Sequence, residues 1–224
     1  MAGIRAMINV IYEDNHLLVV EKPINVPVQK DNSNDEDLLT ILKKYIKEKY
    51  DKPGNVYLGL VHRLDRPVGG IMVFAKTSKC ASRLSEQVRS KKLKKTYYAV
   101  VEGKICDNGT FIDKLKKDEK TNITRVSSEG KEAILHFNRI DTKENMSLVK
   151  IDLETGRSHQ IRVQFSSRSY PLYGDKKYNI NSKEEGQIAL FAKEISFYHP
   201  TTKQLLTFSV DIPNCYPFNI FDVK

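Results

Sequence analysis

The sequence predicts an α+β protein built on a mixed, largely antiparallel β-sheet. Three observations predict this class: about eight strand-like runs, three or four amphipathic segments with helical spacing, and several consecutive strand runs joined by short turns. Alternating βαβ units would instead place a helix between successive strands. Apolar residues recur along most of the chain without a Pro-, Gly- or Ser-rich linker, so we expect one domain over residues 8–224 after a frayed leader over 1–7.

The first half of the chain has clear element boundaries. Strand runs are expected at 8–12, 17–21, 56–61 and 71–76, and amphipathic helices at 35–50 and from 78 to about 88. Asp35 is the expected N-cap of the first helix, and Thr77 or Ser78 that of the second. A loop over 22–28 contains two prolines, which cannot donate to a strand ladder.

The second half begins with a strand over 96–102. Residues 104–131 are polar and poorly patterned, which predicts a surface excursion. Alternating strands follow at 132–138 and 148–153, and then a short helix that is capped by Ser158 and buries Ile161 and Phe165. The C-terminal runs 187–198 and 205–211 have the pattern of a hairpin.

Composition bounds the function. The 224 residues (25.7 kDa) are 40% hydrophobic and 29% charged, and no apolar run reaches the roughly 18 residues of a membrane span. Lys and Arg total 37 against 28 Asp and Glu, a net charge of +9 that favours an anionic partner such as nucleic acid. The alternative is a soluble protein that is merely basic. Three scattered cysteines, without a CxxC pair or a signal peptide, indicate reduced thiols and a cytoplasmic protein.

A first polar cluster, His62-Arg-Leu-Asp65, lies between two predicted strands, where scaffolds often present reactive groups. Pro67 and the Gly69-Gly70 pair predict a turn whose backbone can approach a ligand closely. Asp65 is therefore a candidate reactive carboxylate. The alternatives are that Asp65 only hydrogen-bonds its own turn and that His62 belongs to the core.

A second polar cluster contains Arg157, His159, Gln160 and Arg162. An arginine near a helix N-terminus opposes the helix dipole, so Arg162 is expected to have an anionic partner, either a carboxylate or a phosphate. A solvated arginine is the alternative.

A basic stretch precedes two tyrosines, and positive charge beside aromatic rings suits RNA phosphates and bases. Its cations are Arg89, Lys91, Lys92, Lys94 and Lys95. A solvated helix end would have the same composition, because cations are favoured at a helix C-terminus.

A metal centre is the rival to a carboxylate site. His62, Asp65 and His159 could be ligands, but the chain has five histidines and no HxH, HExxH or cysteine-pair pattern. The nucleotide-binding pattern GxxxxGK[ST] and the nucleophile pattern GxSxG are also missing. The sequence therefore predicts neither a metal nor a cofactor.

Five segments together resemble RluA-type pseudouridine synthases, enzymes that isomerise uridine in RNA. The segment from His62 to Thr77 is similar to the family's HRLDxxTSG…AKT, and Lys95 to Gly103 is similar to its KxYxAxVxG strand. The remaining matches are Gly156-Arg-Ser-His-Gln-Ile-Arg-Val with GRxHQIRxH, Lys22-Pro23 with KPxG, and Pro171-Leu-Tyr-Gly-Asp with PLxGD. All five occur in the family's order.

The resemblance implies a catalytic domain with a cleft crossing its sheet, no cofactor, and Asp65 as a nucleophile that adds to C6 of uracil or acts at C1′ of the ribose. An ionised carboxylate suits either route, since the reference pKa of aspartate is about 3.9. Arg162 would pair with Asp65, and Tyr97 would pack on the base and assist with the C5 proton. Arg63 would enter the gap left in the RNA helix or support the extruded nucleotide. The rest of the substrate site would comprise His62, Arg157, His159 and Gln160, with the basic stretch along the RNA backbone.

Three positions depart from the family pattern. Val68-Gly69 replaces Thr-Ser, Gln164 stands where histidine is common, and Asn25 replaces the KPxG glycine. No S4-type RNA-binding domain is present, so this one domain is expected to hold structured tRNA or rRNA as a monomer, with no required protein partner and no membrane. The other function classes are a catalytically inactive RNA-binding protein, which would not need Asp65, Tyr97 and Arg162 together, and a metal-dependent RNA hydrolase.

Overall fold

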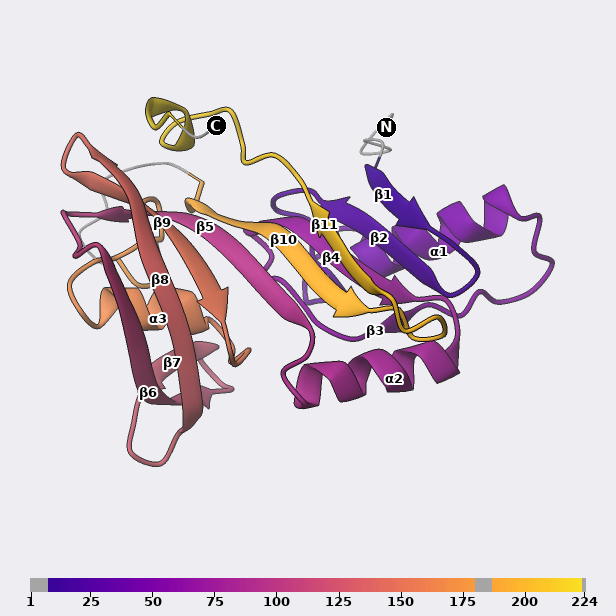
Figure 1. The fold of residues 1–224 in the computed structure, drawn as a ribbon. Coiled ribbons are helices and arrows are strands. Elements are labelled where there is room, and N and C mark those ends of the chain that lie inside the picture. Colours follow the sequence, from indigo (N-terminus) through magenta and orange to yellow (C-terminus); the bar gives the residue numbers. More distant parts are fainter. Residues whose placement is uncertain (1–7, 180–186, 223–224) are drawn as a thin grey trace. The chain divides into compact units, whose positions relative to one another are not determined.

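The computed structural model describes residues 8–179 and 187–222, so the leader expected over 1–7 lies outside the described residues. The described chain has three α-helices and eleven strands (Figure 1). The strand pairs described below are antiparallel. The predicted α+β class is therefore confirmed. The chain forms two compact units: residues 1–93 with 194–210, and residues 94–193 with 211–224.

The first unit is built on β2 (Leu17–Lys22), which pairs with β1 (Val10–Glu13) on one side and β4 (Gly69–Ala75) on the other. All seven residues of β4 are buried, as expected for a strand covered on both faces. The short β3 (Gly59–Leu60) pairs only with the end of β4, so the strand predicted over 56–61 is reduced to two residues. A hairpin joins β10 (Leu190–Tyr198) to β11 (Leu205–Ser209), as predicted.

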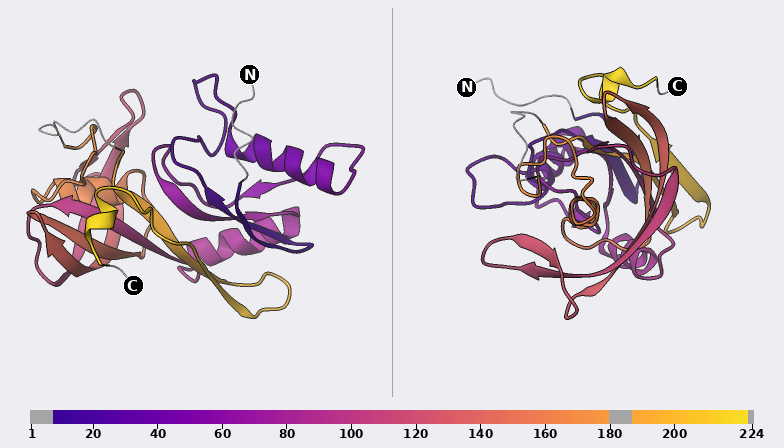
Figure 2. Two further views of the ribbon diagram at one scale, coloured as in Figure 1. Left: turned by 90° about the horizontal axis from the view of Figure 1, so that it is seen from above. Right: turned by 90° about the vertical axis from the view of Figure 1, so that its left-hand side faces the viewer.

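Two amphipathic helices, α1 (Leu38–Lys49) and α2 (Ser78–Arg89), lie against the strands of this unit (Figure 2). Leu38, Leu42 and Ile46 bury one face of α1. Thr77 caps α2 as predicted, since its side chain accepts the Cys80 N–H at 3.2 Å. The prediction of Asp35 as the cap of α1 is wrong: Asp37 is the cap, because it accepts both the amide and the hydroxyl of Thr40, at 3.0 and 2.7 Å.

Glu13 gathers four donors at the edge of this unit. Its carboxylate accepts hydrogen bonds from Lys49 (2.7 Å), Lys76 (2.8 Å), Tyr45 (2.9 Å) and Tyr50 (2.9 Å). Burial alone would raise the pKa of Glu13, but these donors stabilise the anion and lower its pKa to about 2. The pairs therefore join β1, α1 and the end of β4 through one ionised side chain.

The second unit is a curved antiparallel sheet with the strand order β5-β9-β8-β6-β7. Its strands are β5 (Lys94–Glu102), β6 (Asn108–Asp118), β7 (Ile123–Val126), β8 (Lys131–Lys143) and β9 (Met146–Leu153). The sheet curves around the short helix α3 (Gln160–Ser166) (Figure 2). Phe165 of α3 packs on Phe111 and Phe137 of the sheet, with ring centroids 5.0 and 5.5 Å away.

The predicted surface excursion over 104–131 is wrong, because most of it forms β6 and β7. Side chains of β6 alternate between exposed and less exposed positions, yet its inward positions include Asp113 and Lys117 as well as Phe111 and Leu115. Polar residues on the inner face conceal the strand period.

Candidate active site

Asp65 lies in the loop between β3 and β4, where a turn is closed by a hydrogen bond from the Val68 N–H to the Asp65 carbonyl at 3.0 Å. The predicted turn is therefore present. Asp65 is half-buried, and Gly70 at the start of β4 has φ +120°, a conformation that other residues rarely adopt. The loop thus fixes a carboxylate that solvent or a ligand can still reach.

Lys22 holds this loop through two hydrogen bonds to backbone carbonyls. It is only 1% exposed, and its ammonium group donates to the carbonyls of Pro23 (2.8 Å) and Arg66 (3.0 Å). Burial lowers the pKa of Lys22 to about 7, and the nearby Asp65 carboxylate acts in the opposite direction. Lys22 therefore ties the end of β2 to the Asp65 turn and places a buried cation close to the candidate nucleophile.

The two neighbours of the turn in the first polar cluster differ in environment. His62 is buried, and its Nε2 accepts the Val73 N–H at 3.2 Å, so the ring holds the loop to β4. Arg63 is exposed and forms no hydrogen bond or ion pair within the described residues. Arg63 is thus available to a ligand, whereas the geometry of His62 favours the core role.

In the second unit, Arg162 has the anionic partner expected from its position on α3. Its Nε and Nη2 donate to the two carboxylate oxygens of Asp175, at 2.8 and 2.6 Å. Both side chains are almost completely buried, with 8% and 0% of their surface exposed. This two-bond geometry fixes the plane of the guanidinium. The pairing of Arg162 with Asp65 stays a prediction, because the two residues belong to separately described units.

Tyr178 connects Arg162 with His159. The Tyr178 ring centroid lies 5.1 Å from Arg162 Cζ, and its hydroxyl lies 2.6 Å from His159 Nδ1. The Tyr178 hydroxyl also accepts the Thr124 N–H at 2.9 Å, and burial raises the pKa of this hydroxyl.

His159 starts α3 with φ +52°, a left-handed conformation unusual for a residue with a side chain. It makes no side-chain cap, so the predicted capping of this helix by Ser158 is wrong. The strained backbone instead directs the ring towards Tyr178.

Gln160 and Arg157 hold the loop before α3. Gln160 is buried: its Oε1 accepts from the Thr155 hydroxyl (2.8 Å) and the Arg157 N–H (3.0 Å), and its Nε2 donates to the Ile134 carbonyl (3.1 Å). Arg157 is exposed and uses Nε for the Glu132 carbonyl at 2.8 Å. The contacts of Gln160 favour a role in loop geometry, while the outer edge of Arg157 faces solvent.

β5 carries Tyr97 and the last cations of the basic stretch. Tyr97 is 5% exposed and pairs with Ile151 of β9. Lys94 is exposed, whereas Lys95 is half-buried. The other cations, Arg89, Lys91 and Lys92, are exposed at the end of α2 and in the turn after it, and Arg89 pairs with Glu86.

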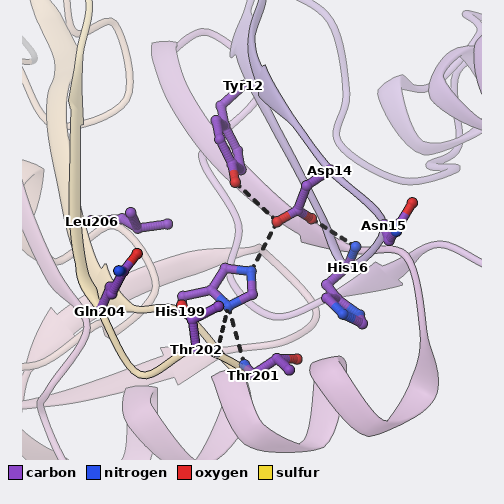
Figure 3. A pocket seen from close by; sticks show the side chains of 9 residues that line it. All are labelled: Tyr12, Asp14, Asn15, His16, His199, Thr201, Thr202, Gln204 and Leu206. Atoms are coloured by element: carbon purple, nitrogen blue, oxygen red, sulfur yellow. Dashed lines mark hydrogen bonds and ion pairs between the residues drawn. The ribbon is translucent and has the colours of Figure 1, made fainter.

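The pair of His199 and Asp14 in the first unit is the main alternative to the Asp65 loop as a catalytic site. It lines a pocket beside the β1–β2 turn and the β10–β11 hairpin (Figure 3). His199 Nδ1 accepts the N–H groups of Thr201 and Thr202, at 3.1 and 2.9 Å, and Nε2 lies 2.9 Å from Asp14. Because amide groups only donate, Nδ1 is unprotonated and Nε2–H donates to Asp14. Neither nitrogen is left as a base, so this pair joins two turns.

No three His, Cys, Asp or Glu side chains among residues 8–179 and 187–222 are arranged to hold a metal ion. No helix in the described part of the chain is long and apolar enough to cross a membrane.

Comparison with known proteins identifies the family. The model described as RNA pseudouridylate synthase matches residues 16–167. The chain belongs to this family of RNA pseudouridine synthases. It is 35% identical over 211 residues to the uncharacterized RNA pseudouridine synthase YhcT of Bacillus subtilis, covering 92% of this chain and 69% of that protein. It is also 35% identical over 216 residues to ribosomal large subunit pseudouridine synthase C of Buchnera aphidicola, covering 90% and 67%.

Solved structures agree on the fold. Human RNA pseudouridylate synthase domain containing 4 superposes with a TM-score of 0.77 at 20% identity, covering 95% of this chain and 90% of that one. The resemblance to RluA-type synthases and the isomerase activity predicted from it are therefore confirmed, and RNA is the substrate class.

Two departures of this pseudouridine synthase from its family pattern have structural explanations. Asn25, in place of the KPxG glycine, has φ +61°, and asparagine tolerates this left-handed conformation better than most residues. Gln164, where histidine is common, is fully buried and donates to Asp113 (2.7 Å) and the Ala133 carbonyl (3.2 Å). Both replacements preserve local geometry. Val68 of the third departure is buried, and nothing else in the structure explains that change.

Sequence reasoning missed Lys22 as a neighbour of Asp65, and Asp175 and Tyr178 as neighbours of Arg162. Lys22 and Asp175 lie inside the KPxG and PLxGD segments, so the motifs contained a signal that they are functional. Tyr178 has no such signal, because its contacts with His159 and Arg162 depend on the path of the loop after Asp175.

Proposed function

We propose that this synthase isomerises one uridine in a loop of a structured ribosomal RNA to pseudouridine, with Asp65 as its nucleophile. The observation that carries the proposal is the Asp65 carboxylate, half-buried in a fixed turn next to the buried Lys22 ammonium, within the HRLD segment of a family member. A loop uridine is favoured because an unstacked base is the easiest to extrude. Transfer RNA is the second substrate class.

The reaction breaks the N1–C1′ glycosidic bond, rotates the uracil and forms a C5–C1′ bond. The C5 proton is lost to solvent, N1 takes up a proton in its place, and the bond made by Asp65 is broken to release the product. In the proposed roles, Asp65 adds to C6 of the uracil or acts at C1′ of the ribose. Tyr97 packs on the base and assists removal of the C5 proton, and Arg162 keeps Asp65 ionised and directed. The atoms balance without an oxidant, a reductant or a cofactor.

Substrate contacts are proposed for the exposed Arg63 and Arg157 and for His159 at the start of α3. His62 and Gln160 act indirectly, since the protein already engages their side chains and they fix the two loops. The exposed cations Arg89, Lys91, Lys92 and Lys94 follow the RNA backbone. We further propose that the protein acts as a monomer in the cytoplasm.

Pseudouridine mapping across all RNAs of a strain that lacks the gene tests the proposal. We expect one site to disappear, to return with the wild-type gene, and to stay absent with Asp65→Asn. Because Asp65 supports the charge of Lys22, the variant must also be shown to be folded and to bind RNA. An Asn variant that restores the site would refute the nucleophile assignment. A site lost in tRNA would exclude the ribosomal substrate, and no lost site would favour a catalytically inactive RNA-binding protein.

A further inference from the structure

Lys95 differs from the other cations of the basic stretch in its position on β5. It lies two residues before Tyr97, so the two side chains project from the same face of the strand. Lys94 is its immediate neighbour and is exposed. Lys95 is therefore associated with the catalytic tyrosine face, and Lys94 is not.

Gly156 makes room for the Lys95 ammonium group. A Cβ atom added to Gly156 would lie 3.1 Å from Lys95 Nζ, closer than most contacts of real side chains. Gly156 is exposed, whereas Lys95 is half-buried. The stem of Lys95 is thus packed in protein while its charged end lies against open backbone that a ligand can reach.

No carboxylate of the described chain neutralises this cation. Lys95 forms neither a hydrogen bond nor an ion pair within residues 8–179 and 187–222. Asp152 of β9 lies across the ladder, but it is opposite Thr96 and accepts the hydroxyl of that residue at 2.7 Å. Desolvation lowers the pKa of Lys95, and no negative charge compensates for it. Two other lysines with packed side chains do have an acid beside them: Lys76 has Glu13, and the fully buried Lys22 has Asp65.

A packed cation without a counter-charge is costly, and an incoming anion removes the cost. Uracil and ribose are neutral, so the anionic groups of an RNA substrate are its phosphates. We propose that Lys95 binds a phosphate directly adjoining the target uridine and that Gly156 keeps the space for this contact. The inference rests on the proposed function and adds to it a fixed phosphate site, distinct from the diffuse contacts of the exposed cations.

The test is a double-mutant cycle, in which a lysine of the protein and a phosphate of the RNA are changed separately and together. The probe is the stem–loop RNA around the uridine found by mapping, made with normal phosphates or with one neutral methylphosphonate on the 5′ or the 3′ side of that uridine. Affinities are measured for Lys95→Met and for the matched control Lys94→Met, both in an Asp65→Asn background so that turnover plays no part. Folding of each variant is checked by circular dichroism.

We expect Lys95→Met to weaken binding of normal RNA about tenfold or more, as loss of a charge-assisted contact should. One of the two methylphosphonates should weaken binding by the parent protein similarly and cause no further loss in Lys95→Met, which identifies the phosphate. Lys94→Met should reduce the affinity for all three RNAs by the same factor. Gly156→Ala should weaken binding of normal RNA less than Lys95→Met does, and this loss should depend on the same phosphate. Lys95→Arg should retain part of the wild-type affinity for normal RNA.

Additive losses at both phosphates would overturn the proposal, as would a Lys95→Met variant that behaves like Lys94→Met. Failure of the proposed function is a separate result. If mapping finds no lost site, the substrate on which Lys95 acts is removed and the inference falls with it. If a site is found but the cycle is additive, the proposed function stands and the phosphate site is refuted.

Discussion

Asp175→Asn should disable the synthase by releasing Arg162. Asp175 contributes both carboxylate oxygens to the guanidinium, at 2.8 and 2.6 Å, and is fully buried. Asparagine keeps the shape but removes the charge and one acceptor. Removing one partner of a buried ion pair costs about 3–5 kcal/mol of unfolding free energy, since the other charge is left uncompensated. For a chain of this size, that corresponds to a fall in Tm of roughly 6–20 °C.

The catalytic effect should be separable from the loss of stability. A displacement of Arg162 by about 1 Å is expected to lower the rate roughly 100-fold, because reacting groups need close alignment. The rate is measured under single-turnover conditions, well below the Tm of the variant, by tritium release from 5-tritiated uridine in the RNA. Affinity for RNA should change little, because the Asp175 side chain has no exposed surface with which to touch the substrate.

Asp113→Asn is the matched control. Asp113 also pairs with an arginine of the same unit, Arg168, through two bonds at 2.9 and 3.1 Å, but the pair is more exposed, at 12% and 31%. A partly exposed pair of this kind contributes about 1 kcal/mol, and the asparagine oxygen can still accept the hydrogen bond from Gln164. We expect a small loss of stability and a normal rate. If Asp175→Asn retains the wild-type rate while folded, or if the two variants lose the same stability, the positioning role of Asp175 is refuted.

Four further outcomes are expected. Tyr178→Phe keeps the ring over Arg162 but removes the hydroxyl contact that holds His159, a hydrogen bond worth about 1 kcal/mol, so RNA affinity should fall roughly fivefold while the single-turnover rate at saturating RNA is unchanged; an unchanged affinity would contradict the role given to the hydroxyl. Replacing Lys91, Lys92 and Lys94 with Gln should flatten the slope of log affinity against log salt by roughly one to two, if about half of the three contact phosphate. Parallel salt titrations for wild type and variant would show these lysines to be ordinary surface. Treatment with a chelator in monovalent salt should leave the rate unchanged, and rescue by one particular divalent ion would revive the hydrolase alternative. Glu13→Gln should lower stability by roughly 3 kcal/mol at pH 7, since each unit of pKa shift corresponds to about 1.4 kcal/mol and the folded pKa is about 2 against 4.5 unfolded. That difference should shrink as the pH falls from about 4.5 towards 2 in urea titrations, and a pH-independent difference would contradict the linkage.

The helix boundaries show how far the sequence could define the fold. The apolar spacing of α1 was sufficient to predict its buried face of Leu38, Leu42 and Ile46. The choice of cap was not predictable, because Asp35, Glu36 and Asp37 all precede the helix and the cap is decided by the contacts of Asp37 with Thr40. Propensity identifies a capping region, and side-chain geometry selects the residue.

The site was predictable where the chemistry is local to a motif. The Asp65 turn and the need of Arg162 for an anion both followed from neighbouring residues and are present in the structure. The identity of that anion was not predictable, because Asp175 lies 13 residues away on a separate loop. The contacts of Gln160 with Thr155 and Ile134 could not be predicted either, because they are tertiary and leave no spacing signal in the sequence.

The three cations of the proposed site, Arg162, Lys22 and Lys95, differ in which group balances their charge, and this difference indicates three different functions. Arg162 is neutralised by Asp175 before any RNA binds, so its orientation does not depend on substrate. Lys22 has the Asp65 carboxylate nearby. A step in which Asp65 forms a covalent bond removes the negative charge that faces Lys22, so Lys22 favours the release of Asp65 as a free anion. Lys95 has no acid within the described chain, and in the proposed phosphate site its positive charge is compensated by the RNA. In the proposed mechanism these three cations have different functions, so a substitution at each should change a different measurement. We expect a change in the rate at Arg162, in the decay of a covalent intermediate at Lys22, and in the affinity for RNA at Lys95.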